Sequence, residues 1–475
     1  MANETFLLKT APQFDVLKWS DYPEVTRVVD AIFGEIKTLR ASRSERIREA
    51  DKVKKHLRVV LIDLWAASKL SLNPYRSISK NKTDYQRESR YRKIHLKYDY
   101  LIKVINDLVR LGYIKEKLGY RFGDDSKRTR IKATDKLIDK ILSQEYGINA
   151  IVESQGQIAL IGTDGESEKI ILRDADENAV EYEDTASTNL MRENLRKINR
   201  KLSSSRIVLK INDTQHAELV ARINGDKDPE RRTIDFTNNQ LHRIFNNSSW
   251  EQGGRFYGGW WQNIPKEYRK YIDINHKPTV ELDYSGHHIR ILYANENLDP
   301  PDEPYDLTEY DREDQKQAVL TMLNASNKEA SLRAMARKGI RNAKGLVKAL
   351  SDRHSQIQHH FFTGIGLNLM YQDSIIAEQV MLRMLERGAV VLPVHDSFIV
   401  RNSYDRELEE IMVAVFQEQY DRTAQLKYKK TMLEERQEIR VQEGRSSGFV
   451  TDDLEEILSD RDRNYRWYRS MWGGL

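Results

Sequence analysis

The stretch TVELDYSGHHIRILYA, residues 279–294, decides how this sequence is interpreted. Its first half alternates apolar and polar residues, which predicts a β-strand that ends at Asp283. A Ser-Gly pair then predicts a tight turn, and the apolar spacing after it predicts a helix. The pattern therefore places one carboxylate at the end of a strand and beside a turn, which suits the binding of a metal ion.

A second carboxylate, Asp396, stands in VVLPVHDSFIV, residues 390–400. Apolar runs of β character flank it, which predicts a hairpin with the acid at its tip. On neighbouring strands, Asp283 and Asp396 could hold two Mg²⁺ ions about 4 Å apart, with Mn²⁺ as an alternative, as in phosphoryl-transfer sites. Taken singly, each acid fits an ordinary turn or helix cap equally well.

A cationic pair lies between these two acids in YDREDQKQAVLTMLNA, residues 310–325. Arg312 and Lys316 are four residues apart, so a helix projects both from the same face. Two cations at this spacing can bind a triphosphate, and Lys316 can protonate the departing pyrophosphate. The alternative is a solvated helix face, because Glu313 and Asp314 lie nearby.

The composition fits a charged globular protein of several domains, with 39% apolar and 32% charged residues in a chain of 475. Cysteine is absent, which excludes disulfides, thiolate zinc sites and cysteine nucleophiles, and makes the cytoplasm the expected location. The apolar runs are much shorter than the roughly 20 residues of a membrane-spanning helix. The amino terminus, MANETFLLKT, also lacks the pattern of a secretion signal. From the short apolar runs and this amino terminus, we expect neither secretion nor membrane association.

The net charge of +4 hides a strong local asymmetry. Residues 76–132 contain 17 Lys and Arg against 7 Asp and Glu, whereas residues 151–184 contain 2 against 10. This distribution indicates a basic module followed by a spacer, and a basic surface would bind mainly to phosphates.

The basic stretch has the pattern of a winged helix-turn-helix. Apolar residues recur at helical spacing over residues 98–113, and Gly112 predicts the end of that helix. Strand-like runs follow at 114–118 and 129–133, joined by a polar, turn-rich segment, and residues 57–69 predict an earlier helix. A charged helical hairpin with a solvated face is the alternative.

Five short motifs, in this order, resemble family A nucleic-acid polymerases, the DNA polymerase I type, and the related single-subunit phage-type RNA polymerases. GGRFYGGWWQNIP, residues 253–265, is similar to a segment upstream of the first catalytic acid of that family. DYSGHHIR matches the first catalytic motif, with Asp283 as the acid and Arg290 as the arginine, and VHDS supplies Asp396. The other two motifs are the spacings of Arg312 with Lys316 and of Asn368 with Gln372.

The resemblance implies an α+β right-hand fold with palm, fingers and thumb, here preceded by a mainly helical, winged-helix-like module. The implied organisation is a basic nucleic-acid-binding module at 1–146, an acidic linker or small β excursion at 147–188, a polymerase core at 189–430 and a charged, largely helical tail at 431–475, whose helical pattern begins near Lys427. The core is implied to have a thumb-like start, a palm at 250–300 and 365–425, and fingers at 301–364.

The resemblance also assigns roles. The implied catalytic residues are Asp283 and Asp396, as ligands of two Mg²⁺ ions, and Lys316. The expected nucleotide-binding residues are Arg312, Lys316, His288, Leu320, Asn324 and Tyr284. The expected nucleic-acid-binding residues are Arg255, Tyr257, Gln262, Asn263, Arg290, Asn368, Gln372 and His395. The implied partners are a DNA primer-template and nucleoside triphosphates, together with replication proteins bound through the amino-terminal module or the carboxy-terminal tail.

The sequence departs from that family around the nucleotide. His288 stands where DNA polymerase I relatives have a Glu that excludes the ribose 2′-hydroxyl, and Leu320 and Asn324 replace Phe and Tyr. Ser397 follows the second acid, as in phage-type RNA polymerases. Because the imidazole is bulky enough to exclude ribose, we expect a DNA-directed DNA polymerase, of a mobile element or phage, with an RNA polymerase or primase as the alternative.

Other functions have weaker support in the sequence. A non-catalytic DNA-binding replication initiator is a second alternative. The sequence contains no G-x-x-x-x-G-K-[ST] loop and no recognisable acidic triplet of a proofreading nuclease. His354, His359 and His360 could suggest zinc, but without Cys or an acid at helical spacing an ordinary helix is expected there.

Overall fold

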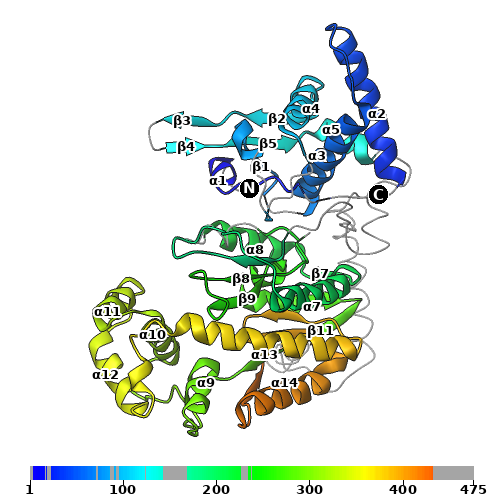
Figure 1. The fold of residues 1–475 in the computed structure, drawn as a ribbon. Coiled ribbons are helices and arrows are strands. Elements are labelled where there is room, and N and C mark those ends of the chain that lie inside the picture. Colours follow the sequence, from blue (N-terminus) through cyan, green and yellow to red (C-terminus); the bar gives the residue numbers. More distant parts are fainter. Residues whose placement is uncertain are drawn as a thin grey trace.

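A computed structural model describes residues 4–16, 18, 23–70, 73–85, 90–91, 96–122, 125–142, 168–225, 234–236, 238–429 and 431. In these ranges the chain has a mixed α/β fold with two hydrophobic cores. One core is built from residues between Phe14 and Ile141, and the other from residues between Ile170 and Phe416. Figure 1 shows them as an amino-terminal tier (4–142, blue and cyan) above a larger main tier (168–429, green to orange).

The amino-terminal tier combines helices with a three-stranded antiparallel sheet of order β1-β5-β2. Its elements are α1 (Glu4–Lys9), α2 (Pro23–Ala41), α3 (Ala50–Leu70), β1 (Arg76–Ile78), η1 (Lys82–Tyr85), α4 (Tyr98–Arg110), β2 (Ile114–Lys117), β3 (Tyr120–Phe122), β4 (Asp125–Lys127), β5 (Thr129–Ala133) and α5 (Asp135–Leu142). The helix expected at 57–69 is part of the longer α3, and the two expected strands are β2 and β5.

Helix α4 follows directly from the spacing of its apolar residues. Leu101, Val104, Ile105 and Leu108 are fully buried and share one face of the helix. Gly112 then takes a φ of 76°, a left-handed conformation that costs glycine little, and the chain continues into β2. The segment expected to be a plain turn instead contains the paired strands β3 and β4. Backbone hydrogen bonds hold this pair, so its polar composition gave no signal.

The main tier contains the motif-bearing half of the sequence. Its elements are β6 (Ile170–Leu172), α7 (Ala186–Ser203), β7 (Ile207–Leu209), α8 (Asp213–Gly225), β8 (His242–Phe245), β9 (Gly253–Tyr257), η3 (Trp260–Gln262), η4 (Lys266–Tyr271), β10 (Ile272–Ile274), β11 (Lys277–Tyr284), α9 (His287–Asn295), α10 (Arg312–Asn324), α11 (Lys328–Arg337), α12 (Ala343–Arg353), η5 (Gln358–His360), α13 (Gly366–Glu386), β12 (Leu392–Val394), β13 (Ser397–Arg401), η6 (Asn402–Tyr404), α14 (Asp405–Tyr420) and β14 (Leu426–Tyr428).

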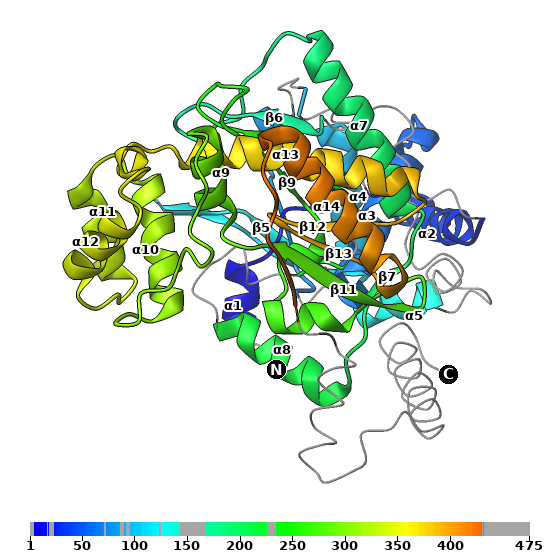
Figure 2. The same cartoon turned by 90° about the horizontal axis from the view of Figure 1, so that it is seen from below.

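A six-stranded sheet organises this tier, with order β12-β13-β11-β10-β7 and β14 paired to β11. A second sheet has the order β6-β8-β9, and α13 packs against β9 and α14. Helices α10, α11 and α12 contact one another and gather to one side of the tier in both views (Figures 1 and 2). The expected strand-turn-helix around Asp283 is β11 and α9, and the expected hairpin around Asp396 is β12 and β13.

The acidic stretch and the charged tail lie at the two ends of the main tier in the sequence. The acidic stretch falls partly outside the described residues, and its remainder includes β6, which pairs in parallel with β8 and buries Ile170 and Leu172. The helical pattern expected from Lys427 onward is wrong at its start, because Lys427 and Tyr428 belong to strand β14. Most of that tail lies outside the described residues.

A buried ion network joins the two tiers. Lys18 Nζ lies 2.9 Å from Asp63 Oδ1 and 3.0 Å from Asp235 Oδ2. Arg76 contacts the same two carboxylates at 3.3 and 2.8 Å. Lys18, Asp63 and Arg76 are almost completely buried, and Asp235 follows Ile234 of the main core. Because two buried cations are balanced by two carboxylates, one from each tier, removing one member would leave the buried charges unbalanced, and the network therefore helps to hold the tiers together.

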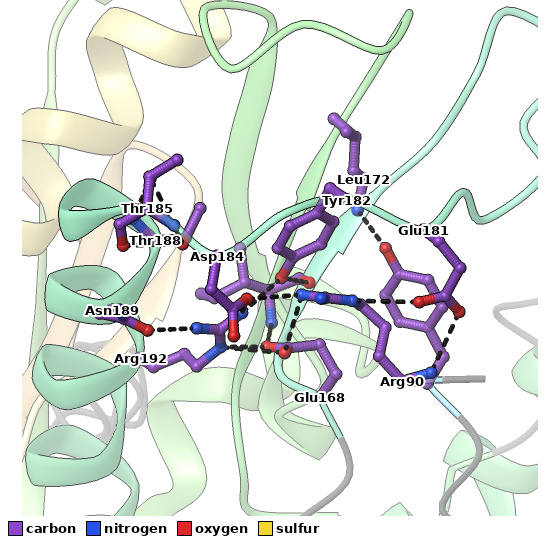
Figure 3. A network of polar contacts seen from close by, with 12 residues as sticks. Arg90, Glu168, Leu172, Glu181, Tyr182, Asp184, Thr185, Thr188, Asn189 and Arg192 are labelled. Atoms are coloured by element: carbon purple, nitrogen blue, oxygen red, sulfur yellow. Dashed lines mark hydrogen bonds and ion pairs between the residues drawn. The ribbon is translucent and has the colours of Figure 1, made fainter. Parts of the chain in front are cut away.

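A second set of contacts between the two tiers surrounds Tyr182 (Figure 3). Arg90 stacks 3.7 Å from the centre of the Tyr182 ring and pairs with Asp184 at 2.9 Å. Arg192 of α7 binds the same Asp184 and also Glu168, at 2.9 Å. The segment that precedes α4 is therefore tied to the start of the main tier as well.

Among the described residues, no helix combines the length and the apolar character needed to cross a membrane.

Candidate metal and nucleotide site

The sheet brings Asp283 and Asp396 to the same place. Strands β11 and β13 are antiparallel neighbours, and Asp283 lies opposite Ser397, the residue after Asp396. The Tyr284 amide also donates a hydrogen bond to the Asp396 carbonyl, at 3.2 Å. Gly286, with a φ of 60°, turns the chain immediately after β11, so the Asp283 carboxylate stands at a strand end.

The two carboxylates repel one another electrostatically. Burial raises the pKa of Asp283, and the charge of Asp396 raises it further. Burial also raises the pKa of Asp396, with the charge of Asp373 as the next contribution. Partly buried carboxylates with raised pKa values favour a cation between them, and carboxylate oxygens are the ligands that Mg²⁺ prefers. The side chains present therefore fit the two-metal expectation.

Lys429, which the sequence did not single out, forms an ion pair with Asp283. It follows β14, and its own amide donates to the Glu281 carbonyl at 2.9 Å. The Asp283 side chain is only 22% exposed, so a cation bound there would have to displace this ammonium group or share the carboxylate with it.

Asp373 is a third acid of the site that sequence reasoning missed. It lies on α13 with its side chain 2% exposed, beside Gln372. Arg255 Nε donates to it at 2.6 Å, and His287 Nε2 lies 3.3 Å away. Burial works against ionisation, but the charge of Arg255 and the His287 contact outweigh it and lower the pKa of Asp373. The sequence pattern alone gave no signal for Asp373, because its burial and its contact with Arg255 depend on the packing of α13 beside β9.

Arg255 also positions His288, the candidate sugar-contacting residue. Its Nη2 donates to His288 Nε2 at 3.1 Å. Burial, followed by the charge of Arg255, lowers the pKa of His288 to about 3, so this imidazole is neutral near pH 7. Arg255 itself is largely buried between Asp373 and His288. Tyr284, expected near the nucleotide, is buried and donates its hydroxyl to the Met412 carbonyl at 2.7 Å.

Helix α10 presents the predicted cations at its start. Arg312 pairs with Glu303 at 2.8 Å and Lys316 pairs with Glu313 at 2.7 Å, with the two cationic side chains 43% and 38% exposed. Tyr305 interacts with Arg312 at the start of this helix and is influenced by the charge of Asp396. Arg312 lies 5.8 Å from the centre of its ring, while burial, and then the charge of Asp396, raise the Tyr305 pKa to about 12.

Leu320 and Asn324 continue the same face of α10, at steps of four residues from Lys316. Leu320 is 38% exposed, and both residues line a groove of about 430 Å³ between α10 and α11. Lys338 also lines that groove.

Besides Arg255, three of the residues expected to contact nucleic acid use their polar groups inside the protein. Gln262 donates to the Phe256 and Pro393 carbonyls at 2.9 and 3.0 Å, which ties β9 to β12. Arg290 donates to the carbonyls of Ser285 and Asp302 at 2.9 and 2.7 Å and so braces the turn after β11. Gln372 Oε1 accepts bonds from the Asn295 amide and the Tyr420 hydroxyl at 3.2 and 3.1 Å.

The other four lie nearer the surface. The rings of Tyr257 and His395 pack edge to face with centroids 6.2 Å apart, beside Asp396. His395 has a φ of 58°, a costly conformation for a residue with a Cβ, and such conformations concentrate at functional sites. Asn263 is exposed after η3, and Asn368 donates to the Glu251 carbonyl at 3.4 Å.

Comparisons with known proteins identify neither a matching family model nor a similar curated protein. Support for a function of this chain therefore comes from its own motifs and from the geometry of the residues around Asp283 and Asp396.

Proposed function

We propose that this chain is a template-dependent nucleic-acid polymerase, most simply a cytoplasmic DNA-directed DNA polymerase with the right-hand architecture. The observation that carries the proposal is that Asp283 and Asp396 meet at neighbouring strands, close enough for the charge of Asp396 to raise the pKa of Asp283. Neither acid is informative alone, but two carboxylates brought together at neighbouring strands are what two-metal nucleotidyl transfer requires.

In this proposal Asp283 and Asp396 hold two divalent cations. Bound there, the metal ions would activate the primer 3′-hydroxyl and neutralise charge on the leaving pyrophosphate. The protein contributes the placement of the two acids: Gln262 and Trp261 both donate to the Pro393 carbonyl, at 3.0 and 3.1 Å, and fix the hairpin that carries Asp396.

Arg312 and Lys316 would bind the triphosphate. Their present partners, Glu303 and Glu313, form exposed ion pairs, which are worth only about 0–1 kcal/mol. A triphosphate, with its multiple charges, can replace them through stronger charge-assisted hydrogen bonds. Lys316 is then placed to donate a proton to the leaving pyrophosphate.

His288 would contact the sugar. Burial, and then the charge of Arg255, keep the His288 ring neutral by lowering its pKa, and the Arg255 contact holds the ring in place. Steric bulk rather than charge would then discriminate against the ribose 2′-hydroxyl. On this basis we propose deoxynucleoside triphosphates as substrates.

The amino-terminal tier would bind duplex DNA in the manner of a winged helix. Its order α3, β1, α4, β2, β5 places α4 between the first strand of the three-stranded sheet and the other two, and the β3–β4 hairpin extends from that sheet as a wing would (Figure 1). Exposed cations lie on α4 and β2, at Lys103, Arg110, Lys115 and Lys117, where they can contact phosphates.

The test is a template-directed extension assay with labelled deoxy- or ribonucleotides, with and without a primer, in the presence of Mg²⁺. Primer-dependent incorporation of deoxynucleotides is expected. Ribonucleotide incorporation, or chains begun without a primer, would indicate an RNA polymerase or primase instead. DNA binding without any incorporation would leave a replication initiator and refute the enzymatic proposal.

A further inference from the structure

Glu296, His359 and His360 form a compact cluster on the surface of the main tier. His359 Nε2 lies 3.0 Å, and His360 Nε2 2.8 Å, from the same oxygen, Glu296 Oε1. One candidate ligand atom from each residue lies within 4.8 Å of the others. Sequence reasoning set these histidines aside because neither Cys nor an acid stood at helical spacing from them. The fold supplies that acid from 63 residues upstream of His359.

The backbone on both sides of the cluster is fixed. Glu296 is the C-cap of α9, and its amide donates to the Tyr293 carbonyl at 3.1 Å. The two histidines belong to η5, which lies between the buried side chains of Ile357 and Phe361. The Thr363 hydroxyl also donates to the His360 carbonyl at 2.7 Å. The three side chains therefore start from anchored positions.

The arrangement of the two imidazoles is unusual for neighbours in sequence. Successive residues of a 3₁₀-helix point about 120° apart, yet these two rings lie 4.1 Å apart and reach one carboxylate oxygen. Hydrogen bonds from His360 and His359 lower the pKa of Glu296, which keeps the carboxylate ionised. Two imidazoles and an ionised carboxylate are a donor set that selects borderline transition metals over Mg²⁺.

We propose that Glu296, His359 and His360 bind a divalent transition-metal ion, with Zn²⁺ as the representative probe. The imidazoles would bind it through Nε2 after moving their protons to Nδ1, and three protein ligands leave a coordination position for water. The ion would connect the end of α9 with the segment that leads into α13. The nearby His354 is excluded as a ligand, because it is buried with its nitrogens 3.2 Å from the Tyr293 hydroxyl and 3.0 Å from the Pro304 carbonyl.

The experiment titrates the full-length, tag-free protein with Zn²⁺ by calorimetry, in saturating Mg²⁺ so that Asp283 and Asp396 do not take up zinc. We compare the wild type with Glu296→Gln, His359→Ala and His360→Ala. His276→Ala, at an exposed histidine in the turn between β10 and β11, is the matched control. Circular dichroism establishes that each variant is folded.

We expect one Zn²⁺ ion per chain in the wild type and in the control, with binding weakened more than about tenfold in each cluster variant. Zn²⁺ should raise the unfolding temperature of the wild type and of the control only. Because the chain has no cysteine, Co²⁺ should give visible d–d bands without a thiolate charge-transfer band. The proposal is refuted if Zn²⁺ does not bind, or if Glu296→Gln and His360→Ala bind it as tightly as the wild type. Neither result bears on polymerase activity.

Discussion

Replacing Asp396 with Asn tests the proposed metal site most directly. The change keeps the shape of the side chain and removes one negative charge from a partly buried position. At an effective dielectric constant of about 20, two unit charges about 4 Å apart interact by about 4 kcal/mol. Losing that stabilisation from a transition state slows a reaction by about a thousandfold. We therefore expect extension to fall at least that far.

The same variant should remain folded, for a reason that the structure gives. Burial and the charge of Asp373 raise the pKa of Asp396, so its ionised form is unfavourable when no cation is bound. Asp396→Asn should then unfold at the same temperature as the wild type, or higher, in Mg²⁺-free buffer. In the wild type, Mg²⁺ should raise the unfolding temperature, and this increase should disappear in the variant.

Single-turnover extension, thermal unfolding and DNA binding by fluorescence anisotropy together make the test. Asp352→Asn, at an exposed position on α12, is the control and should behave as the wild type in all three. If Asp396→Asn extends primers at the wild-type rate, the assignment of the site is wrong. If Asp396→Asn loses DNA binding together with extension, the Asp396 charge contributes to DNA binding as well as to the proposed metal site.

Three further predictions concern residues that only the structure singles out. Lys429→Met removes the cation paired with Asp283, so half-maximal extension should need several-fold less Mg²⁺; an unchanged requirement in a Mg²⁺ titration would show that Lys429 does not compete with the metal. Lys18→Met should lower the free energy of unfolding by about 3–5 kcal/mol in urea denaturation, because it leaves one cation, Arg76, to balance the two buried carboxylates of Asp63 and Asp235. Lys54→Met breaks the exposed ion pair with Asp30 and should lower the free energy of unfolding by less than about 1 kcal/mol. Equal losses in Lys18→Met and Lys54→Met would contradict this difference between buried and exposed ion pairs. Burial, followed by the charges of nearby cations, lowers the pKa of His242 from 6.5 to about 4. The unfolded chain therefore binds a proton at His242 more tightly than the folded chain does, and the free energy of unfolding should fall as the pH drops from about 6.5 to about 4. In urea denaturation at several pH values, the free energy of unfolding should depend less on pH in His242→Gln than in the wild type. The same pH dependence in both proteins would refute this role of His242.

The sequence predicted those features that depend on local pattern. The apolar spacing of α4 specified a helix because every third or fourth residue must face the core. The strand ending at Asp283 and the hairpin carrying Asp396 were likewise visible, because alternation and turn residues are local signals. Their pairing was inferred from the motif order, and the register between β11 and β13 now supplies the geometry.

The remainder of the site depends on contacts between distant segments, which no local pattern contains. Asp373 reads as one more polar residue of a helix until α13 packs beside β9 and brings it to Arg255. Lys429 stands in a charged tail and reaches Asp283 only because β14 joins the sheet. Arg255 was expected to contact the duplex from its motif alone, whereas the structure gives it two partners inside the protein.

The ion network of Lys18, Asp63, Arg76 and Asp235 has a consequence for where the proposed polymerase would act on bound DNA. A tethered DNA-binding module samples many positions, but one held by desolvated charges keeps a set separation from the sheet that carries Asp283. If the amino-terminal tier binds duplex DNA as proposed, the primer 3′ end that is extended would lie a constant number of base pairs from the duplex that this tier holds.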